Sequence, residues 1–218
     1  KIPGNGVESS GAFTVGAAGT ASNLAGIPFY KNDTSSIYTH DVSGTDDTAA
    51  LNTAYGITAL DAITTGDNNT VVGSGAGSAL NTGHRNTLMG QGAGSLLTTA
   101  THTVAIGNAA ASGYDTEIHN VAIGHVALGG SVAGGEYNVA VGSVSLDALT
   151  SGDGNVGVGY GTGSTLTTGD YNVAVGYETM HGGATTGDKN ISIGFRAGYD
   201  LTSGENNTFI GHVAGFEC

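Results

Sequence analysis

The chain has 218 residues, 40 of them glycine, and a formal net charge of −13. Because phosphate backbones need Lys and Arg, this charge argues against a nucleic-acid partner, and no apolar run approaches the roughly 20 residues of a membrane span. Hydrophobic residues make up 39% of the chain, which is too many for a disordered linker. With only two prolines and no Gly at every third position, the chain is not a collagen.

The first part of the chain, residues 1–48, lacks the pattern that dominates the rest. It holds both prolines, and its segment Ile27–Asp33 is typical of an extended strand or loop. An open solenoid end exposes sheet edges, so this part is expected to cap the first coil or to connect it to another section. We therefore predict two parts, a non-repeat segment at 1–48 and a repeat domain of about nine to ten coils at 49–218.

From Asn52 onward one short phrase recurs: Asn, an apolar or Thr residue, a small or apolar residue, Val or Ile, and Gly. Successive closing glycines are 17 or 18 residues apart, and a fixed period of this kind is the signature of a solenoid. The prediction is an all-β fold, a parallel β-solenoid or β-roll with two short strands in each 17–18-residue coil. The closing glycines after the first copy are Gly73, Gly90, Gly107, Gly124, Gly142, Gly159, Gly176, Gly194 and Gly211.

Side chains alternate along a strand, so each phrase also predicts two faces. The β-branched residues, such as Val139 and Val141, are expected to fill the interior of the coil. The small residue between them then points outward, which suggests close approach of another surface. We interpret this second face as an interface between chains, with a solvated strand position as the alternative; its residues are Ala105, Ala122, Ala140 and Ala174.

The most regular polar feature is a column of Asn residues, one in nearly every coil. Stacked Asn side chains can form a ladder of hydrogen bonds, so we expect a structural ladder that fixes the register between coils. Its members are Asn69, Asn86, Asn120, Asn138, Asn155, Asn172, Asn190 and Asn207.

Acidic residues recur in the turn before the Asn, where stacking would bring like charges close together. A salt-screened edge is favoured over a metal site, because Arg85 and His102 interrupt the set and the calcium-binding GGxGxD pattern is missing. The acids are Asp67, Asp153, Asp170, Asp188 and Glu205. His125 and His212 share the position after the closing Gly, which varies between coils as an exposed or receptor-facing rim would.

Enzyme signatures are missing from the sequence. The Gly-rich phrase Gly73–Ser78 recurs with the coil period and lacks the Lys of a phosphate loop. No Gly-x-Ser-x-Gly phrase stands between a strand and a helix, and the one cysteine, Cys218, cannot form a disulfide within the chain. We expect no catalytic site, no metal and no cofactor.

The phrases NVAIG and NVAVG with Gly-Asp-x-Asn turns resemble the repeats of trimeric autotransporter adhesin heads. The longer unit, with Leu-Thr-Thr-Gly-Asp-x-Asn, is similar to repeats in tail-fibre-like proteins of marine and cyanobacterial phages. The resemblance covers roughly residues 50–218. It implies a homotrimer, intertwined or side by side, on a virion or a cell surface. It does not identify the host receptor or glycan that such a protein would bind.

The repeat and its resemblance leave several functions open. The first is the shaft or host-contact segment of a phage tail fibre or spike, located on the virion. The second is the head of a bacterial cell-surface adhesin, and a subunit of another extracellular filament is a further alternative. The third is a tailspike that cuts polysaccharide, which needs paired carboxylates, whereas the repeat offers one acid per coil. We predict the first function.

Overall fold

The structure is a computed structural model that describes residues 22–24, 27–29, 36–39, 48–113, 115–130 and 134–216. Strands β1 (Ser22–Leu24) and β2 (Ile27–Phe29) form an antiparallel pair, so the segment expected to be extended does contain a strand. The rest of the predicted cap or connector, and Cys218, lie outside the described residues apart from 36–39 and Thr48.

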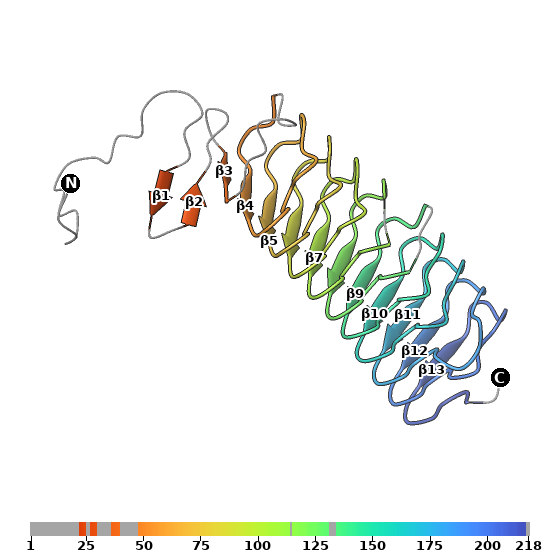
Figure 1. Ribbon diagram of the computed structural model, residues 1–218. Helices are drawn as coiled ribbons and strands as arrows, with labels where there is room; N and C mark the ends of the chain where they lie inside the picture. The colour runs from red at the N-terminus through yellow and green to blue at the C-terminus, as the bar shows by residue number, and fades with distance from the viewer. Residues whose placement is uncertain are drawn as a thin grey trace, which may run out of the picture.

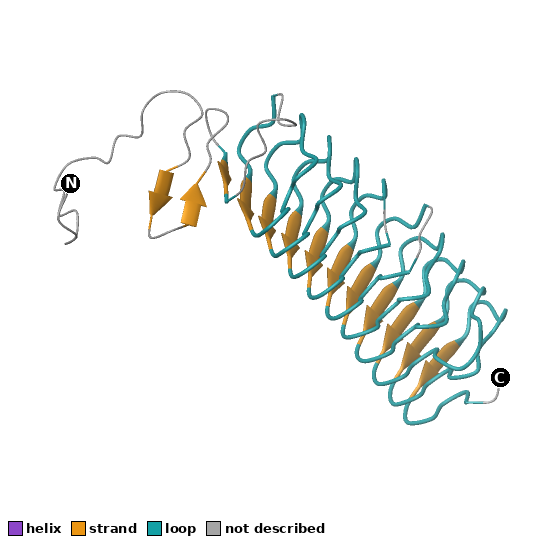
Figure 2. Ribbon diagram, in the orientation of Figure 1, coloured by secondary structure: helices purple, strands orange, loops and turns teal. Residues whose placement is uncertain are grey.

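Eleven strands form one parallel sheet, in which every strand pairs with its neighbours along the chain. The coils stack as a ladder, with the strands along one side and turns closing the other sides (Figures 1 and 2). The strands are β3 (Ile37–Tyr38), β4 (Thr53–Tyr55), β5 (Thr70–Val72), β6 (Thr87–Met89), β7 (Val104–Ile106), β8 (Val121–Ile123), β9 (Val139–Val141), β10 (Val156–Val158), β11 (Val173–Val175), β12 (Ile191–Ile193) and β13 (Thr208–Ile210). The predicted all-β parallel solenoid is confirmed.

The register of the sheet follows the sequence period. Val156 pairs with Val173, 17 residues on, and Val173 pairs with Ile191, 18 residues on. The sheet starts before the predicted boundary at residue 49, because Ile37 pairs with Thr53. The first strand of the solenoid therefore belongs to the part of the chain that lacks the repeat phrase.

Each described coil has one strand, so the expected second strand is wrong. The residues after the closing glycine form a run of turns, in which the second and fourth positions have left-handed backbone angles, as at Val144 (φ 49°) and Leu146 (φ 51°). An extended strand cannot hold such angles. The turns are instead joined by hydrogen bonds between coils, for example from the Val144 N–H to the His125 carbonyl at 2.9 Å.

The predicted faces of the strand are inverted. The small middle residue points into the coil and is fully buried, as at Ala105, Ala122 and Ala140, and Ala174 is 1% exposed. The β-branched residues on either side point outward and are half-buried or exposed. The reason in these layers is the narrow interior of the coil. The inward side chain of the strand shares the layer with side chains from the turns, so only a small residue fits beside a large one.

The interior is filled by complementary volumes at two positions, the middle of the strand and the fourth residue after the closing glycine. In the coil of β8 the strand residue is Ala122 and the turn residue is Leu128. In the coil of β9 the strand residue is Ala140 and the turn residue is Leu146. Where the strand offers Leu88, the turn offers Gly94, and a Cβ built on Gly94 would lie 3.0 Å from a Leu88 methyl. These layers combine one large and one small residue, which gives the close packing that interiors require. In the coil of β10 both positions are glycine, Gly157 and Gly163, and Leu146 of the preceding coil fills the space beside them.

Candidate functional site

The Asn side chains form a ladder of hydrogen bonds inside the solenoid. The Asn155 side-chain amide donates to the Gly169 carbonyl at 2.8 Å and to Asn138 Oδ1 at 3.2 Å. Its own Oδ1 accepts the Asn172 backbone N–H at 2.8 Å. The ladder extends to Asn52, one coil before the predicted set. Because a buried carboxamide is costly without partners, this column fixes the register of neighbouring coils.

Thr103 interrupts the ladder. Its backbone N–H donates the usual hydrogen bond to Asn86 Oδ1 at 2.9 Å. Thr103 has no side-chain carboxamide, so Asn120 in the next coil lacks the acceptor that the other members of the ladder have. Its hydroxyl oxygen is buried without a hydrogen-bond partner. This coil is therefore the weak point of the column.

Replacing Thr103 by Asn is expected to raise the free energy of unfolding by about 1 kcal/mol, since it removes an unsatisfied hydroxyl and adds the missing hydrogen bonds. Urea denaturation of the wild type and the variant measures the change. The control is Asn155→Thr, which creates the same interruption in an intact part of the ladder and should destabilise the protein. A destabilised Thr103→Asn variant would show that the local backbone does not accept the carboxamide.

The closing glycines mark the corner at which the strand ends. Their φ angles lie between 128° and 141°, a region that is essentially reserved for Gly. A Cβ on Gly90 would also lie 2.3 Å from the carbonyl oxygen of Gly107 in the next coil. Both observations explain why the glycine recurs in every coil.

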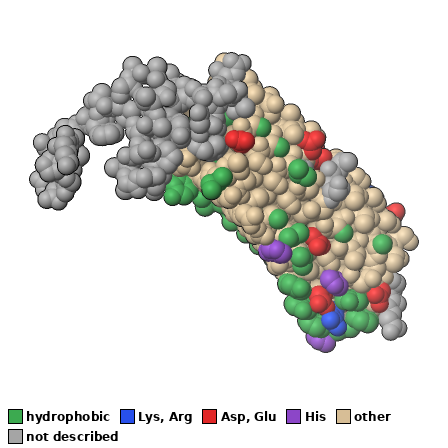
Figure 3. Space-filling model, viewed as in Figure 1, with side chains coloured by type: hydrophobic (Ala, Val, Ile, Leu, Met, Phe, Trp, Pro, Cys, Tyr) green, Lys and Arg blue, Asp and Glu red, His purple; other side chains and the backbone are tan. Residues whose placement is uncertain are grey.

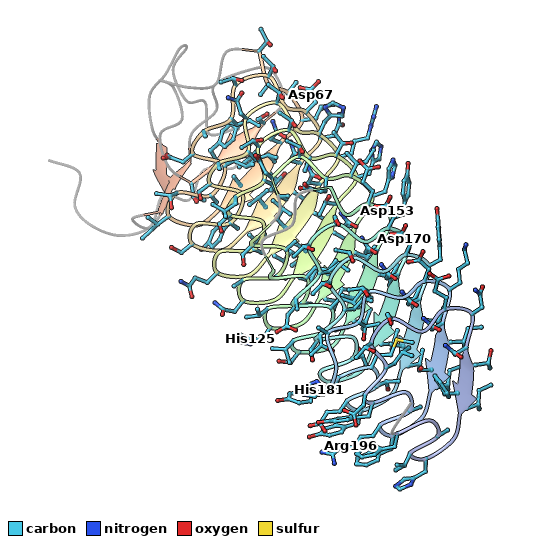
Figure 4. The ribbon with its side chains drawn as sticks, turned by 90° about the vertical axis from the view of Figure 1, so that its right-hand side faces the viewer. Asp67, His125, Asp153, Asp170, His181 and Arg196 are labelled. Carbon is cyan, nitrogen blue, oxygen red and sulfur yellow. The ribbon has the colours of Figure 1, made fainter. Side chains whose placement is uncertain are left out.

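The turn acids have a structural role in the solenoid. The carboxylates of Asp170 and Asp188 accept backbone N–H groups of the preceding coil, those of Asp153 and Asp170, at 2.9 and 2.8 Å. Asp67 accepts the Ala50 N–H at 2.7 Å. Figure 4 shows Asp67, Asp153 and Asp170 along one edge of the solenoid. Within the part of the chain that the structure describes, no three His, Cys, Asp or Glu side chains are grouped to hold a metal ion.

Arg85 and His102 do not take the place of the acids in their coils, as the prediction had it, but lie one residue later in the turn. Arg85 and His102 lie at the position after the acid, where the His102, His119 and Tyr137 rings stack with centroid distances of 4.8 and 5.2 Å. Desolvation lowers the pKa of His102, and repulsion from His119, Arg85 and His84 lowers it further. This edge is therefore a stack of rings beside the acids.

The first candidate interaction surface is the outer strand face, formed by the first and third residues of β4–β13. Both columns are β-branched and apolar from β7 to β12, and no charged residue occurs in either column. Ile191 and Ile193 are 39% and 37% exposed. Strands lie about 4.8 Å apart, so the eleven-stranded sheet extends this face for tens of ångströms. Continuous apolar surface of this size is typical of an interaction site.

The second candidate is an aromatic platform near the C-terminal end, made of Tyr160, Tyr177, Phe195, His212, Tyr199 and Phe216. The first four occupy the position after the closing glycine and stack in series, and Tyr199 stacks on Phe216. Apolar, His, Arg and acidic side chains gather at this end of the molecule (Figure 3), and His125, His181 and Arg196 lie on the edge opposite the acids (Figure 4).

Sequence reasoning noticed that the position after the closing glycine varies, but it missed the platform. The sequence pattern that could have revealed the platform is the recurrence of an aromatic or His residue every 17 or 18 residues from Tyr160 to His212. It also missed the pair Arg196–Glu178, joined at 2.5 Å from Nη2 to Oε2.

Comparisons with known proteins add no family assignment: no family model, curated protein or solved structure matches the chain. In the described residues, no helix is long and apolar enough to cross a membrane. The class that the fold defines is a β-solenoid repeat protein.

Proposed function

We propose that this solenoid is the shaft of a homotrimeric fibre, the tail fibre or spike of a phage, in which three copies pack through their outer strand faces. The observation that carries the proposal is the uncovered apolar sheet face. From Val104 to Ile193 it presents two columns of Val and Ile to the outside. A partner that buries this face removes apolar surface from water, which contributes about 25 cal/mol per Å².

The way the solenoid is stabilised also supports a shaft role. Each coil pairs only with its neighbours, so length is added by adding coils, and the Asn ladder holds each coil in register. The net charge of −13 keeps such a rod soluble and limits unspecific lateral association. A virion location and host contact are proposed together with this assembly.

Light scattering after size exclusion tests the assembly. A trimer has three times the chain mass of 21.3 kDa. A species with the mass of one chain would contradict the assembly. The phage assignment is tested by the flanking gene sequence: a virion-binding or chaperone segment supports it, whereas a membrane barrel would place the chain in a bacterial adhesin.

The variant Val141→Lys is expected to convert the trimer to single chains, because it places a charge in the middle of the buried face, where an unpaired charge costs several kcal/mol. Light scattering reads out the mass. The matched control is Ser151→Lys in an exposed turn, which should stay trimeric. A Val141→Lys protein with unchanged mass and melting would refute the outer strand face as the interface. Ala140→Glu is no test, since Ala140 lies inside the coil.

A further inference from the structure

The rings of the aromatic platform are stacked in a regular series along the solenoid. The centroid distances from Tyr160 to Tyr177, Phe195 and His212 are 5.3, 5.6 and 5.1 Å, and neighbouring planes differ by 6–17°. These distances exceed the separation of about 3.5–4.0 Å between carbon atoms in direct contact, so no ring is completely covered by its neighbours. Tyr160, Tyr177 and Phe195 are accordingly 50%, 46% and 41% exposed.

A polar pair is built into the platform. The Arg196 guanidinium lies 5.3 Å from the centroids of both Phe195 and Tyr199, so it joins the two ring columns. Glu178 accepts from Arg196 Nε at 2.7 Å. A hydrogen bond to Glu178 raises the pKa of the Tyr177 hydroxyl, and the bond to Arg196 lowers the pKa of Glu178. These contacts hold the rings and the polar groups in place before any ligand binds, which favours binding.

We propose that the aromatic platform binds an extended, neutral, β-linked glycan that lies along the solenoid axis with one sugar on each coil. Sugars in an extended β-1,4-linked chain follow one another at close to the spacing of parallel strands, about 5 Å, so successive C–H faces meet successive rings. The Glu178–Arg196 pair supplies an acceptor and donors for hydroxyl groups. This inference deepens the proposed host-contact role and rests on it.

The charges favour a neutral ligand. Glu178 and Arg196 neutralise each other, and the remaining chain is strongly acidic, so an anionic polymer is repelled at long range. The ring series spans only four coils, which is short for a standard protein interface of about 800 Å² per partner. A linear oligosaccharide of a few sugars fits this length.

Calorimetric titration of the full chain with cellohexaose and chitohexaose tests the proposal, with maltohexaose as the geometric control because its α-1,4 linkages coil the chain. We expect saturable binding of at least one β-linked probe, with at least tenfold weaker binding of maltohexaose. Tyr177→Ala should weaken binding at least tenfold. Tyr171→Ala, in the same coil but on the edge before the Asn and 60% exposed, should leave it unchanged.

Three results would overturn the inference: no saturable binding of either β-linked probe, equal binding of maltohexaose, or equal binding by Tyr177→Ala at an unchanged melting temperature. Light scattering on the same samples separates this inference from the assembly. A trimer that binds no glycan removes the glycan inference alone. A single-chain species that binds cellohexaose removes the trimer and leaves the platform.

Discussion

The variant Gly90→Ala is expected to lower the free energy of unfolding by about 2–6 kcal/mol. The added Cβ would lie 2.3 Å from the Gly107 carbonyl oxygen, and relieving that contact means moving the backbone of the next coil. Overpacking of this kind costs about 1–3 kcal/mol, and a non-glycine residue at φ 136° costs a further 1–3 kcal/mol. Urea denaturation followed by circular dichroism measures the loss.

The matched control is Gly92→Ala, two residues away in the same coil. Gly92 also has a positive φ, 66°, but a Cβ there meets nothing within 4 Å. Only the left-handed backbone penalty of about 1–2 kcal/mol applies. If the two variants lose equal stability, the contact between coils is not the reason for the recurring glycine.

The variant Leu88→Ala is expected to lower the free energy of unfolding by about 3–4 kcal/mol, inside the range of about 2–5 kcal/mol for a buried Leu whose removal leaves a cavity. Leu88 is fully buried, and its methyls fill the space over Gly77 and Gly94. Thermal and urea unfolding measure the cost.

A second substitution tests the complementary packing. In the layers of Ala122 and Ala140 the cavity is filled by Leu128 and Leu146, both with φ near 50°. Adding Gly94→Leu to Leu88→Ala should therefore recover part of the stability. Gly94→Leu alone should destabilise because its Cβ meets both Leu97 and Leu88. A coupling free energy of about 2 kcal/mol is expected for such neighbours. Additive effects would contradict the packing of these two positions against each other.

The sequence alone was sufficient for the period, for the position of the one strand in each coil that contains the recurring phrase, and for the parallel stacking. The Asn and Gly residues recur because each coil makes the same contacts with the next coil. Their spacing in the sequence therefore predicts the length of a coil and the stacking of successive coils. The same local pattern could not decide which side of a three-residue strand faces inward. Alternation predicts that a strand has two faces, but it does not say which face is buried. That depends on the space inside the coil, which is set by Leu88, Leu128, Leu146 and other side chains from different coils.

The candidate surfaces depended on tertiary structure for the same reason. Val139 and Val141 were expected inside because β-branched residues are usually buried, and the structure turned them outward because Ala140 alone fits beside Leu146. The aromatic platform needs rings 17 or 18 residues apart to be stacked, and the Glu178–Arg196 pair joins two coils. The sequence by itself determined that this protein is a parallel β-solenoid. Only the tertiary structure decided which residues it offers to partners, because exposure follows from how the coils fill their shared interior.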